Sequence, residues 1–369
     1  MSDLSGLRIA YLCLQATTPG QASYAHVHEI IAGLRDLGAA VDLFEPSYAD
    51  GSHAGVVKRL YEFARVQTRL VRRLGEYDVL YVRGHPLAWP TARCAHRRRL
   101  TVVQECNGMV DDFFIAWPAA RRFVRLITTL TYAQFRQADR VVVGSAGLAA
   151  WLERVAGVQA AVVPNGANVE VFRPMPRPAG VQLPERYAVF FGSLAPWQGL
   201  ATSLAAVGEP SWPDGVSLVV LGSGALQAEV VAAAEADERI KYLGIVPYDE
   251  VAPILSNAVC SLVNKEQPEF AQAGISPLKL YESMACGVPV VATYGMPGLT
   301  EVVADGQVGL LVPQGDPDEL ARAVATLAKE PALAAEMGAR ARKLAVEECS
   351  WQARSREIGR IIVEASAPV

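Results

Sequence analysis

The sequence predicts an α/β protein with two domains, each built on a doubly wound parallel sheet. Short apolar runs alternate with amphipathic segments of helical length along the whole chain. Continuous apolar runs are typical of parallel strands that helices cover on both faces. The alternation is interrupted by residues 172–187, which are rich in proline and show no hydrophobic period. With 369 residues, the chain is long enough for two domains of ordinary size.

Six strands are expected on each side of the interruption. Ligands of doubly wound sheets bind beyond the carboxyl ends of the strands, so we expect two Rossmann-like domains that face each other across a ligand-binding cleft. In the first half, the expected strands are residues 7–14, 40–45, 78–83, 100–105, 140–145 and 160–164. In the second half, they are residues 187–192, 216–222, 239–244, 258–263, 288–293 and 309–313.

Amphipathic stretches fill the gaps between these strands. Helices are expected at residues 24–37, 56–74 and 119–137 in the first half, and at 317–327, 331–347 and 351–364 near the end. The last helix follows the final strand and is long enough to cross back to the first domain. The predicted boundaries are 1–175 for the first domain, 176–186 for a linker, 187–348 for the second domain and 349–369 for the crossover helix.

Charge is unevenly distributed. Residues 1–180 hold 21 basic and 15 acidic side chains, whereas residues 181–369 hold 13 and 23. A basic helix is expected at 56–74, because apolar residues recur there at helical spacing. Its polar face is either a solvated surface, an attachment to an anionic membrane or a site for a phosphorylated acceptor. The net charge of −4 argues against a nucleic-acid partner. The apolar positions of this helix are Val57, Leu60, Ala64, Val71 and Leu74.

Other features narrow the class of protein. No apolar run is long enough to span a bilayer, and the start of the chain lacks the features of a secretory leader. Neither the six scattered cysteines nor His26 and His28, two apart on one helix, have the spacing of metal ligands. We therefore expect no metal and a cytoplasmic location, with contact to the inner face of the plasma membrane as one alternative.

The stretch GISPLKLYESMACGVPVVAT, residues 274–293, carries the strongest chemical signal. Lys279 and Glu282 are three residues apart and share one face of a helix near its first turn. Helix N-termini attract phosphate, and a carboxylate there can bind hydroxyl groups. The stretch predicts a site for a ligand that carries both groups. The alternative is an ordinary ion pair on the helix surface.

Five motifs in order resemble those of retaining glycosyltransferases with the GT-B fold, of the glycosyl transferase group 1 and family 4 type. The resemblance covers nearly the whole chain and is strongest from Val162 to Val312. The motifs are VVPNGANVEVFRP (162–174), FGSLAPWQGL (191–200), VVLGSG (219–224), IKYLGIVPYDEVAPIL (240–255) and SPLKLYESMACGVPVVAT (276–293).

The resemblance implies transfer of a sugar from a nucleotide-diphosphate sugar, without a metal or other cofactor. The acceptor would be a hydroxyl of a glycan, a lipid-linked intermediate or a small molecule. Family frequency favours a UDP-sugar over GDP-mannose. Two alternatives stay open: a relative that binds the sugar nucleotide without transferring the sugar, and a sugar-nucleotide epimerase, against which the motifs argue.

The resemblance also implies a donor site on the second domain. Glu282 matches the glutamate that holds the donor ribose, and Lys279 lies where phosphate charge collects, so we also give it a catalytic role. The turn before Lys279 holds the diphosphate through backbone amides, although Pro277 has no N–H. The expected donor site further includes Gly20 after the first strand, Gly222, Val246 beside the base, and the turn residues Ile275, Ser276, Pro277 and Leu278.

The sequence departs from the family pattern within that site. A sugar-binding glutamate is replaced by Gly274, and its contact would fall to Glu266 or Glu269. A pair of cations that neutralises the leaving diphosphate is replaced by Ser193 and Gln198. Electrostatic stabilisation is usually the largest catalytic effect, so Lys279 or an arginine of the first domain must substitute.

A third departure concerns the first domain. A histidine that often ends its fourth strand falls within QECNG, residues 104–108. Glu105 or Asn107 is then expected to face the reacting sugar and to be catalytic. Arg83 and His85, which follow the third strand, are candidate acceptor contacts, with a capping or surface role as the alternative for His85.

Overall fold

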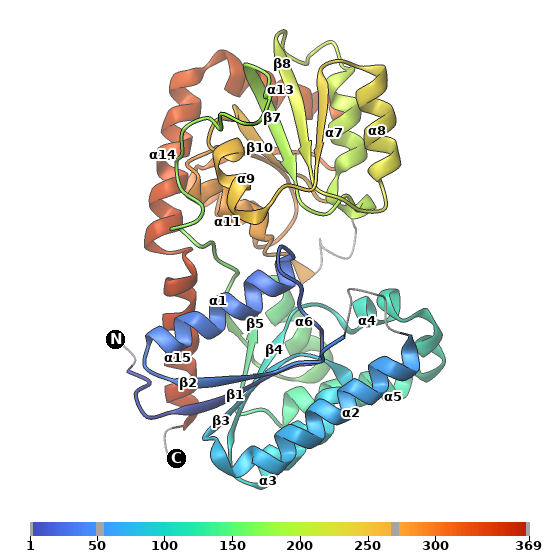
Figure 1. Ribbon diagram of the computed structural model, residues 1–369, viewed down its shortest axis with the longest axis vertical. Helices are drawn as coiled ribbons and strands as arrows, with labels where there is room; N and C mark the ends of the chain where they lie inside the picture. Colours follow the sequence, from blue (N-terminus) through green and yellow to red (C-terminus); the bar gives the residue numbers. More distant parts are fainter. Residues whose placement is uncertain (1–2, 49–54, 267–272, 367–369) are drawn as a thin grey trace. The chain divides into compact units, whose positions relative to one another are not determined.

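The computed structural model describes residues 3–48, 55–266 and 273–366 of the chain. By their contacts, these residues divide into two compact units (Figure 1). The first runs up to Pro164 and includes the chain from Arg354 onward, and the second comprises Asn165–Ala353. In the described residues, each unit contains one sheet of six parallel strands. The predicted α/β fold class is confirmed.

The first sheet has the strand order β2-β1-β3-β4-β5-β6. The order reverses beside β1, which pairs with both β2 and β3. Register places Cys13 beside Arg83, and Arg83 beside Glu105, at the carboxyl ends of three neighbouring strands. All six strands were predicted: β1 (Arg8–Cys13), β2 (Ala40–Phe44), β3 (Val79–Arg83), β4 (Thr101–Cys106), β5 (Arg140–Val143) and β6 (Ala161–Val162).

Helices cover this sheet because its strand residues are apolar on both faces. Alternate strand residues, such as Leu12 and Val82, pack with Phe63 and Leu70 of one helix and Ala95 of another. The helices of the unit are α1 (Ala22–Asp36), α2 (Val56–Arg73), α3 (Trp89–Arg97), α4 (Val110–Ala116), α5 (Val124–Arg136), α6 (Ala146–Ala156) and α15 (Trp351–Ser366), with the 3₁₀ turns η2 (Leu74–Glu76), η3 (Pro86–Ala88) and η4 (Pro118–Phe123).

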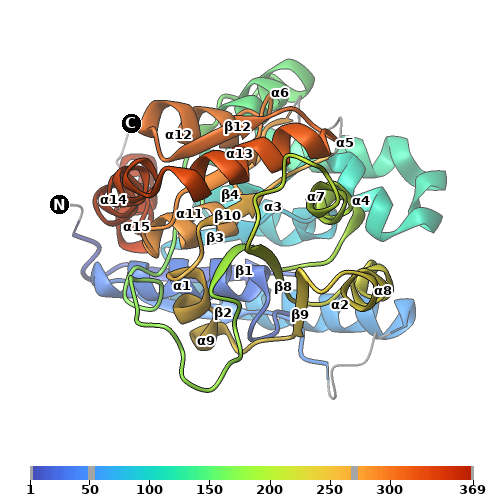
Figure 2. The ribbon, with the colours of Figure 1, turned by 90° about the horizontal axis from the view of Figure 1, so that it is seen from above.

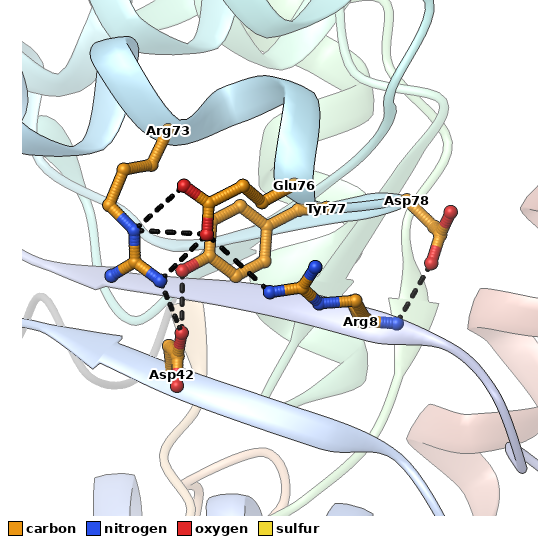
Figure 3. Close-up of polar contacts among 6 residues, drawn as sticks. All are labelled: Arg8, Asp42, Arg73, Glu76, Tyr77 and Asp78. Carbon is orange, nitrogen blue, oxygen red and sulfur yellow. Dashed lines mark hydrogen bonds and ion pairs between the residues drawn. The ribbon is translucent and has the colours of Figure 1, made fainter.

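A polar network joins the end of α2 to the strands of this sheet (Figure 3). Asp42 on β2 accepts hydrogen bonds from Tyr77 Oη at 2.6 Å and from Arg73 Nη2 at 3.2 Å. The backbone N–H of Arg8 donates to Asp78 Oδ2 at 2.9 Å. The ion pairs are partly exposed and contribute little stability, so the network mainly fixes the position of α2 on the sheet.

The buried face of α2 differs from the predicted one. Phe63, Val66 and Leu70 are buried, whereas Val57 is 82% exposed and Leu60 is 46% exposed. Apolar spacing alone predicted the helix correctly but did not distinguish its core face from an apolar strip on its surface.

The second sheet has the strand order β12-β11-β10-β7-β8-β9. Here the order reverses beside β7, which pairs with both β8 and β10. Again all six strands were predicted: β7 (Arg186–Phe191), β8 (Val216–Leu221), β9 (Ile240–Gly244), β10 (Cys260–Val263), β11 (Val290–Thr293) and β12 (Gly309–Val312).

Two apolar cores lie on opposite faces of this sheet. Val189 and Phe191 point to one core, and Ala188 and Phe190 to the other, as the period of two along β7 requires. Figure 1 and Figure 2 show α7 and α8 on one side of the sheet and α9 and α11 on the other. The helices are α7 (Leu200–Val207), α8 (Gln227–Ala236), α9 (Tyr248–Leu255), α11 (Leu278–Ala285), α12 (Leu299–Gly306), α13 (Pro317–Lys329) and α14 (Pro331–Glu347), preceded by the turn η5 (Pro196–Gln198).

The division between the units falls at Pro164, before the expected end of the first domain at residue 175. Residues 165–175 belong to the second unit because they pack there. Ala167 N–H donates to Cys349 O, Trp351 N–H donates to Ala167 O, and Phe172 is fully buried in a core of that unit.

The crossover helix α15 starts in the second unit and continues into the first, from Arg354 onward. Gly359 lies against Leu4 and Leu37, and Ser366 Oγ donates to Thr101 Oγ1 at 3.1 Å. Among the described residues, no helix combines the length and apolar character that a bilayer crossing requires.

Gly222 brings two backbone segments into contact and cannot carry a side chain without rearrangement. Its φ is +121°, and a Cβ there would lie 1.9 Å from Gly192 O. We expect Gly222→Ala to lower the free energy of unfolding by about 2–4 kcal/mol, from strain and overpacking together. Calorimetric unfolding of the purified chain measures this loss.

Gly180→Ala is the matched control for Gly222→Ala, because no atom lies within 4 Å of its added Cβ and its φ is not positive. The control should be neutral or stabilising by a few tenths of a kcal/mol. Equal effects of the two substitutions would contradict the steric assignment.

Candidate functional site

Apart from Gly20, the residues expected to bind a donor lie in the second unit, in the segments that follow β7, β8, β9 and β10 and on α11. A loop, residues 192–199, follows β7 and carries Ser193 and Gln198. Gly192 N–H donates to Leu221 O, and Leu194 N–H donates to Ser223 O, so this loop is fastened to the end of β8. We call residues 192–199 the β7 loop.

The turn before α11 is held by the first residue of the unit. Asn165 N–H donates to Ser276 Oγ at 2.8 Å, and Asn165 Nδ2 donates to Ser276 O. Ser276 Oγ also lies 3.1 Å from Tyr281 Oη. These contacts give the turn a fixed shape next to the N-terminus of the helix.

One backbone donor of this turn is already used. Ile275 N–H donates to Pro297 O at 2.8 Å. This amide is therefore not available to a diphosphate, contrary to the expectation from the sequence. Pro277 is the N-cap residue of α11 and its helix end has no side-chain cap. Leu278 and Lys279 therefore carry the amides that the first turn leaves without intrahelical acceptors.

Lys279 is a buried lysine in the first turn of α11. Its Nζ lies 4.1 Å from the centroid of the Phe190 ring and has no hydrogen-bond partner among the described residues. Burial, and then the neighbouring Lys265, hold the pKa of Lys279 well below its usual value, although Glu282 opposes the shift. A buried ammonium without a partner is costly, and a bound anion would relieve that cost.

Glu282 lies one helical turn further on and is also buried. Its Oε1 accepts a hydrogen bond from Tyr248 Oη at 3.1 Å. Burial raises the pKa of Glu282 to about 7, against the opposing effects of Tyr248 and Lys279. The described contacts include no ion pair between Lys279 and Glu282, so the surface ion pair considered from the sequence does not form.

The other residues expected to bind the donor have different surroundings. Ser193 is exposed, Val246 is half-buried against the core, and Gly274 has a φ of +69°. Gly222 lies against Gly192, as described above. Glu269, one of the two expected substitutes for the missing glutamate, lies outside the described residues.

Sequence reasoning missed Lys265. It follows β10 and is 6% exposed, and its Nζ donates to Gln198 Oε1 at 2.6 Å. Burial lowers the pKa of Lys265 to about 7. The sequence feature that could have identified Lys265 is its place in LVNKE, two residues after an apolar strand and at the sheet end where ligands bind.

The first unit has a different cluster at the carboxyl ends of its strands, with Glu105 at its centre. Glu105 Oε2 accepts from Tyr81 Oη at 2.9 Å and from Tyr11 Oη at 3.4 Å. Its Oε1 lies 2.7 Å from His26 Nε2 and 3.3 Å from Arg83 Nη1. Both carboxylate oxygens are therefore occupied.

Glu105 is ionised at neutral pH. Burial alone would raise its pKa, but His26, Arg83 and a hydrogen bond from Asn107 outweigh burial and lower the pKa to about 2. An ionised carboxylate only accepts hydrogen bonds, so His26 must donate from Nε2. Glu105 is 3% exposed and anchors its neighbours, which does not fit the expectation that it faces a sugar.

The other predicted residues of the first unit have distinct surroundings. Arg83 is held by Glu105, and Asn107 is exposed beside it. His85 Nδ1 accepts from Leu87 N–H and caps η3, and burial lowers the pKa of His85 to about 4, so the capping alternative holds. Gly20 has a φ of +85° in an open loop before α1.

No group of three or more His, Cys, Asp and Glu side chains that could hold a metal ion occurs within residues 3–48, 55–266 and 273–366. The polar chemistry of the second unit is instead two buried ammonium groups, a buried carboxyl and free helix amides. This set can bind a ligand with phosphate and hydroxyl groups.

Two family models match the chain. Residues 25–171 match glycosyltransferase family 4, and residues 185–330 match glycosyl transferases group 1. The chain is 26% identical to a phosphatidyl-myo-inositol mannosyltransferase of Mycobacterium leprae, over 96% of both chains. It is 27% identical to a GDP-mannose-dependent alpha-(1-6)-phosphatidylinositol monomannoside mannosyltransferase of Mycolicibacterium smegmatis, over 80% of both.

Solved structures share the fold. A sucrose-phosphate synthase of Thermosynechococcus elongatus matches with a TM-score of 0.77 and 19% identity, over 97% of this chain and 98% of the other.

Removing the charge of Glu105 should destabilise the first unit. We expect Glu105→Gln to cost about 3–5 kcal/mol at pH 7, because Arg83 and His26 lose a buried counter-charge. The native pKa of about 2 lies below the unfolded value. The stabilisation from Glu105 is thus fully present above about pH 5 and fades as the pH falls towards 2. Chemical unfolding as a function of pH measures both effects.

The control is Glu336→Gln, which removes an exposed carboxylate paired with Arg340 on α14. It should change stability by less than about 1 kcal/mol. If both variants unfold alike at pH 7, Glu105 is not the anchor of this cluster.

Proposed function

Because the chain belongs to the GT-B glycosyltransferases, we propose that it transfers a sugar from a nucleotide-diphosphate sugar to an acceptor hydroxyl with net retention at the anomeric carbon. The donor is bound by the second unit, and no metal ion takes part. The observation that carries this proposal is that Lys279, buried at the start of α11, has no hydrogen-bond partner for its Nζ among the described residues.

A diphosphate matches this site in charge and in hydrogen bonding. The free amides of Leu278 and Lys279 point along the axis of α11, where the helix dipole favours an anion. Protonated Lys279 adds a positive charge, and its Nζ has no hydrogen-bond partner among the described residues. Glu282 is one turn away and can accept hydrogen bonds from ribose hydroxyls.

We propose a same-face course for the reaction. The acceptor oxygen bonds to the anomeric carbon as the bond to the diphosphate oxygen breaks, and the acceptor proton passes to that leaving oxygen. Lys279 and the helix amides stabilise the charge that develops on the diphosphate. The chain's contribution is thus positioning and electrostatics rather than a covalent intermediate.

The proposed role of the first unit is acceptor binding. Asn107 is exposed at the end of β4, and Arg83 is fixed beside it by Glu105. Glu105 itself acts as a positioning residue through Arg83 and His26. Asn107 is therefore the better candidate for contact with the reacting sugar.

The relatives bring GDP-mannose forward as a donor beside the UDP-sugar that family frequency favours. One matched protein is named as GDP-mannose-dependent, and another as a mannosyltransferase acting on phosphatidyl-myo-inositol. Their names favour mannose as the sugar and a lipid-linked inositol as the acceptor. A UDP-sugar with a glycan or small-molecule acceptor is the other candidate.

Turnover and binding test this proposal together. We expect nucleotide diphosphate to be released from UDP-glucose or GDP-mannose only when an acceptor is present. Lys279→Met should weaken binding of the matching nucleotide diphosphate about 10- to 100-fold, the effect of losing one charged hydrogen bond. Calorimetric titration measures the affinity, and Lys329→Met, at the exposed last residue of α13, serves as the control.

Binding without release for every donor and acceptor would instead identify a protein that only binds sugar nucleotides. An unchanged affinity in Lys279→Met would show that the phosphate lies elsewhere.

We also propose that the first unit contacts anionic membranes. Val57 and Tyr61 of α2, and Phe123 and Leu126 near the start of α5, are exposed apolar side chains. The guanidinium carbon of Arg59 on α2 lies 4.8 Å from the centroid of the Trp117 ring. Trp117 directly precedes η4, which leads into α5, so this contact connects α2 to the start of that segment. Basic residues lie beside the apolar ones, which is the composition of an interfacial surface. They are Lys58, Arg59, Arg65, Arg121, Arg122 and Arg125.

Vesicle sedimentation tests this contact. The chain should bind vesicles of equal phosphatidylcholine and phosphatidylglycerol, and should be released by 0.5 M salt, because about 1 kcal/mol per basic residue is electrostatic. Val57→Asp should reduce binding several-fold. Val231→Asp, on an exposed apolar position of α8, should not. Equal binding to pure phosphatidylcholine would contradict the proposal.

A further inference from the structure

We propose that Lys265 is a second diphosphate-binding cation, so that two buried lysines reach the β7 loop from outside it and replace cations on the loop itself. This inference rests on the proposed donor site of the second unit. It identifies the group that compensates for Ser193 and Gln198, which carry no charge.

Lys265 reaches one end of the β7 loop. Its backbone N–H donates to Thr293 Oγ1 at 2.8 Å, which fixes the residue between the ends of β10 and β11. Its Nζ donates to Gln198 Oε1 at 2.6 Å. Gln198 therefore aims the ammonium but, being neutral, does not balance its charge.

Lys279 reaches the other end of the same loop. A Cβ at Gly192 would lie 3.9 Å from Lys279 Cε, so this side chain passes close to the first residue of the loop. The two ammonium groups come from different segments, one after β10 and one on α11. The charge of Lys265 contributes, after burial, to the low pKa of Lys279.

The described residues do not balance these two charges. Neither lysine takes part in an ion pair within the described residues. Among the described residues, the acidic groups nearby include Glu282, which is bonded to Tyr248, and Glu266, whose Oε1 would lie 3.3 Å from a Cβ at Gly199. Two buried lysines in one site favour a multiply charged anion, because such an anion stabilises the protonated forms of both.

A nucleoside diphosphate has that charge, and it carries more of it after the sugar leaves. Two lysines as point charges can follow a diphosphate whose charge shifts towards the leaving oxygen. Burying the two lysines costs free energy in the unliganded protein, and a bound diphosphate offsets that cost. The two lysines therefore stabilise the negative charge of the departing diphosphate, whereas they gain little from the uncharged sugar of the donor.

The site should take up protons when the ligand binds. Burial lowers the pKa of Lys265 to about 7, so part of the population is neutral above that pH. A bound anion raises the pKa of both lysines and draws protons in, and the affinity falls as the pH rises above 7. Glu282, whose pKa is raised to about 7, acts in the opposite direction if hydroxyls favour its ionised form. The difference between the wild type and a Lys265 variant isolates the lysine.

The test is calorimetric titration of Lys265→Met with UDP, UMP and uridine, and with GDP, GMP and guanosine. We expect the dissociation constant of the diphosphate that binds the wild type to rise 10- to 100-fold, and that of its nucleoside to change less than 2-fold. At pH 8, in buffers of different ionisation enthalpy, the variant should take up fewer protons per diphosphate than the wild type. Lys329→Met is the control for loss of one positive charge.

The outcomes separate this inference from the proposed function. If the wild type binds none of these nucleotides, the proposed function fails and the inference with it. If the wild type binds a diphosphate and Lys265→Met binds it equally well with equal proton uptake, the inference alone is overturned.

A second variant decides the case where Lys265→Met does not fold. Gln198→Glu places a carboxylate where Lys265 Nζ now donates, and this internal anion should raise the pKa of the lysine before any ligand binds. We expect weaker diphosphate binding together with reduced proton uptake at pH 8. Unchanged proton uptake would overturn the inference, because an effect that bypasses Lys265 would not alter it.

Discussion

Parallel sheets that are covered on both faces confine polar chemistry to the ends of their strands. In each unit of this protein the strand interiors are apolar and nearly inaccessible to water. Charged side chains that must be buried therefore appear where the strands end. Glu105 lies one residue before the end of β4 in the first unit, and Lys265 follows β10 in the second. Both functional clusters depend on this constraint.

The two units treat buried charge in opposite ways. In the first, Glu105 has a partner for each carboxylate oxygen, including Tyr81, His26 and Arg83. In the second, Lys279 Nζ lies over the Phe190 ring without a hydrogen-bond partner among the described residues, and Lys265 donates only to the neutral Gln198. A fully bonded charge is a structural element, whereas the two lysines without a counter-charge among the described residues form the site for which we propose an anionic ligand. This contrast separates the anchor from the binding site more clearly than residue type does.

The fold could be predicted from the sequence because each strand is a continuous apolar run, and all twelve expected strands are present. The face of α2 could not, because Val57 and Leu60 are apolar yet exposed. A sequence pattern reports which residues are apolar but not which of them a core accepts. The family motifs located the turn at Ser276 and the helix of Lys279.

Details of hydrogen bonding were beyond sequence reasoning. Ile275 looks like any other amide donor in the sequence, but Pro297 O already accepts its N–H. Lys265 is a single lysine among polar neighbours, and only its three-dimensional contact with Gln198 gives it significance.

The hydrogen bonds between Asn165 and Ser276 lie close to a point where the chain passes from one unit to the other. The chain passes between the units at Pro164–Asn165 and again within α15, between Ala353 and Arg354. Asn165, the first residue of the second unit, is hydrogen-bonded to the turn for which we propose diphosphate binding. A diphosphate bound there would therefore also brace the backbone at the first of these two chain crossings.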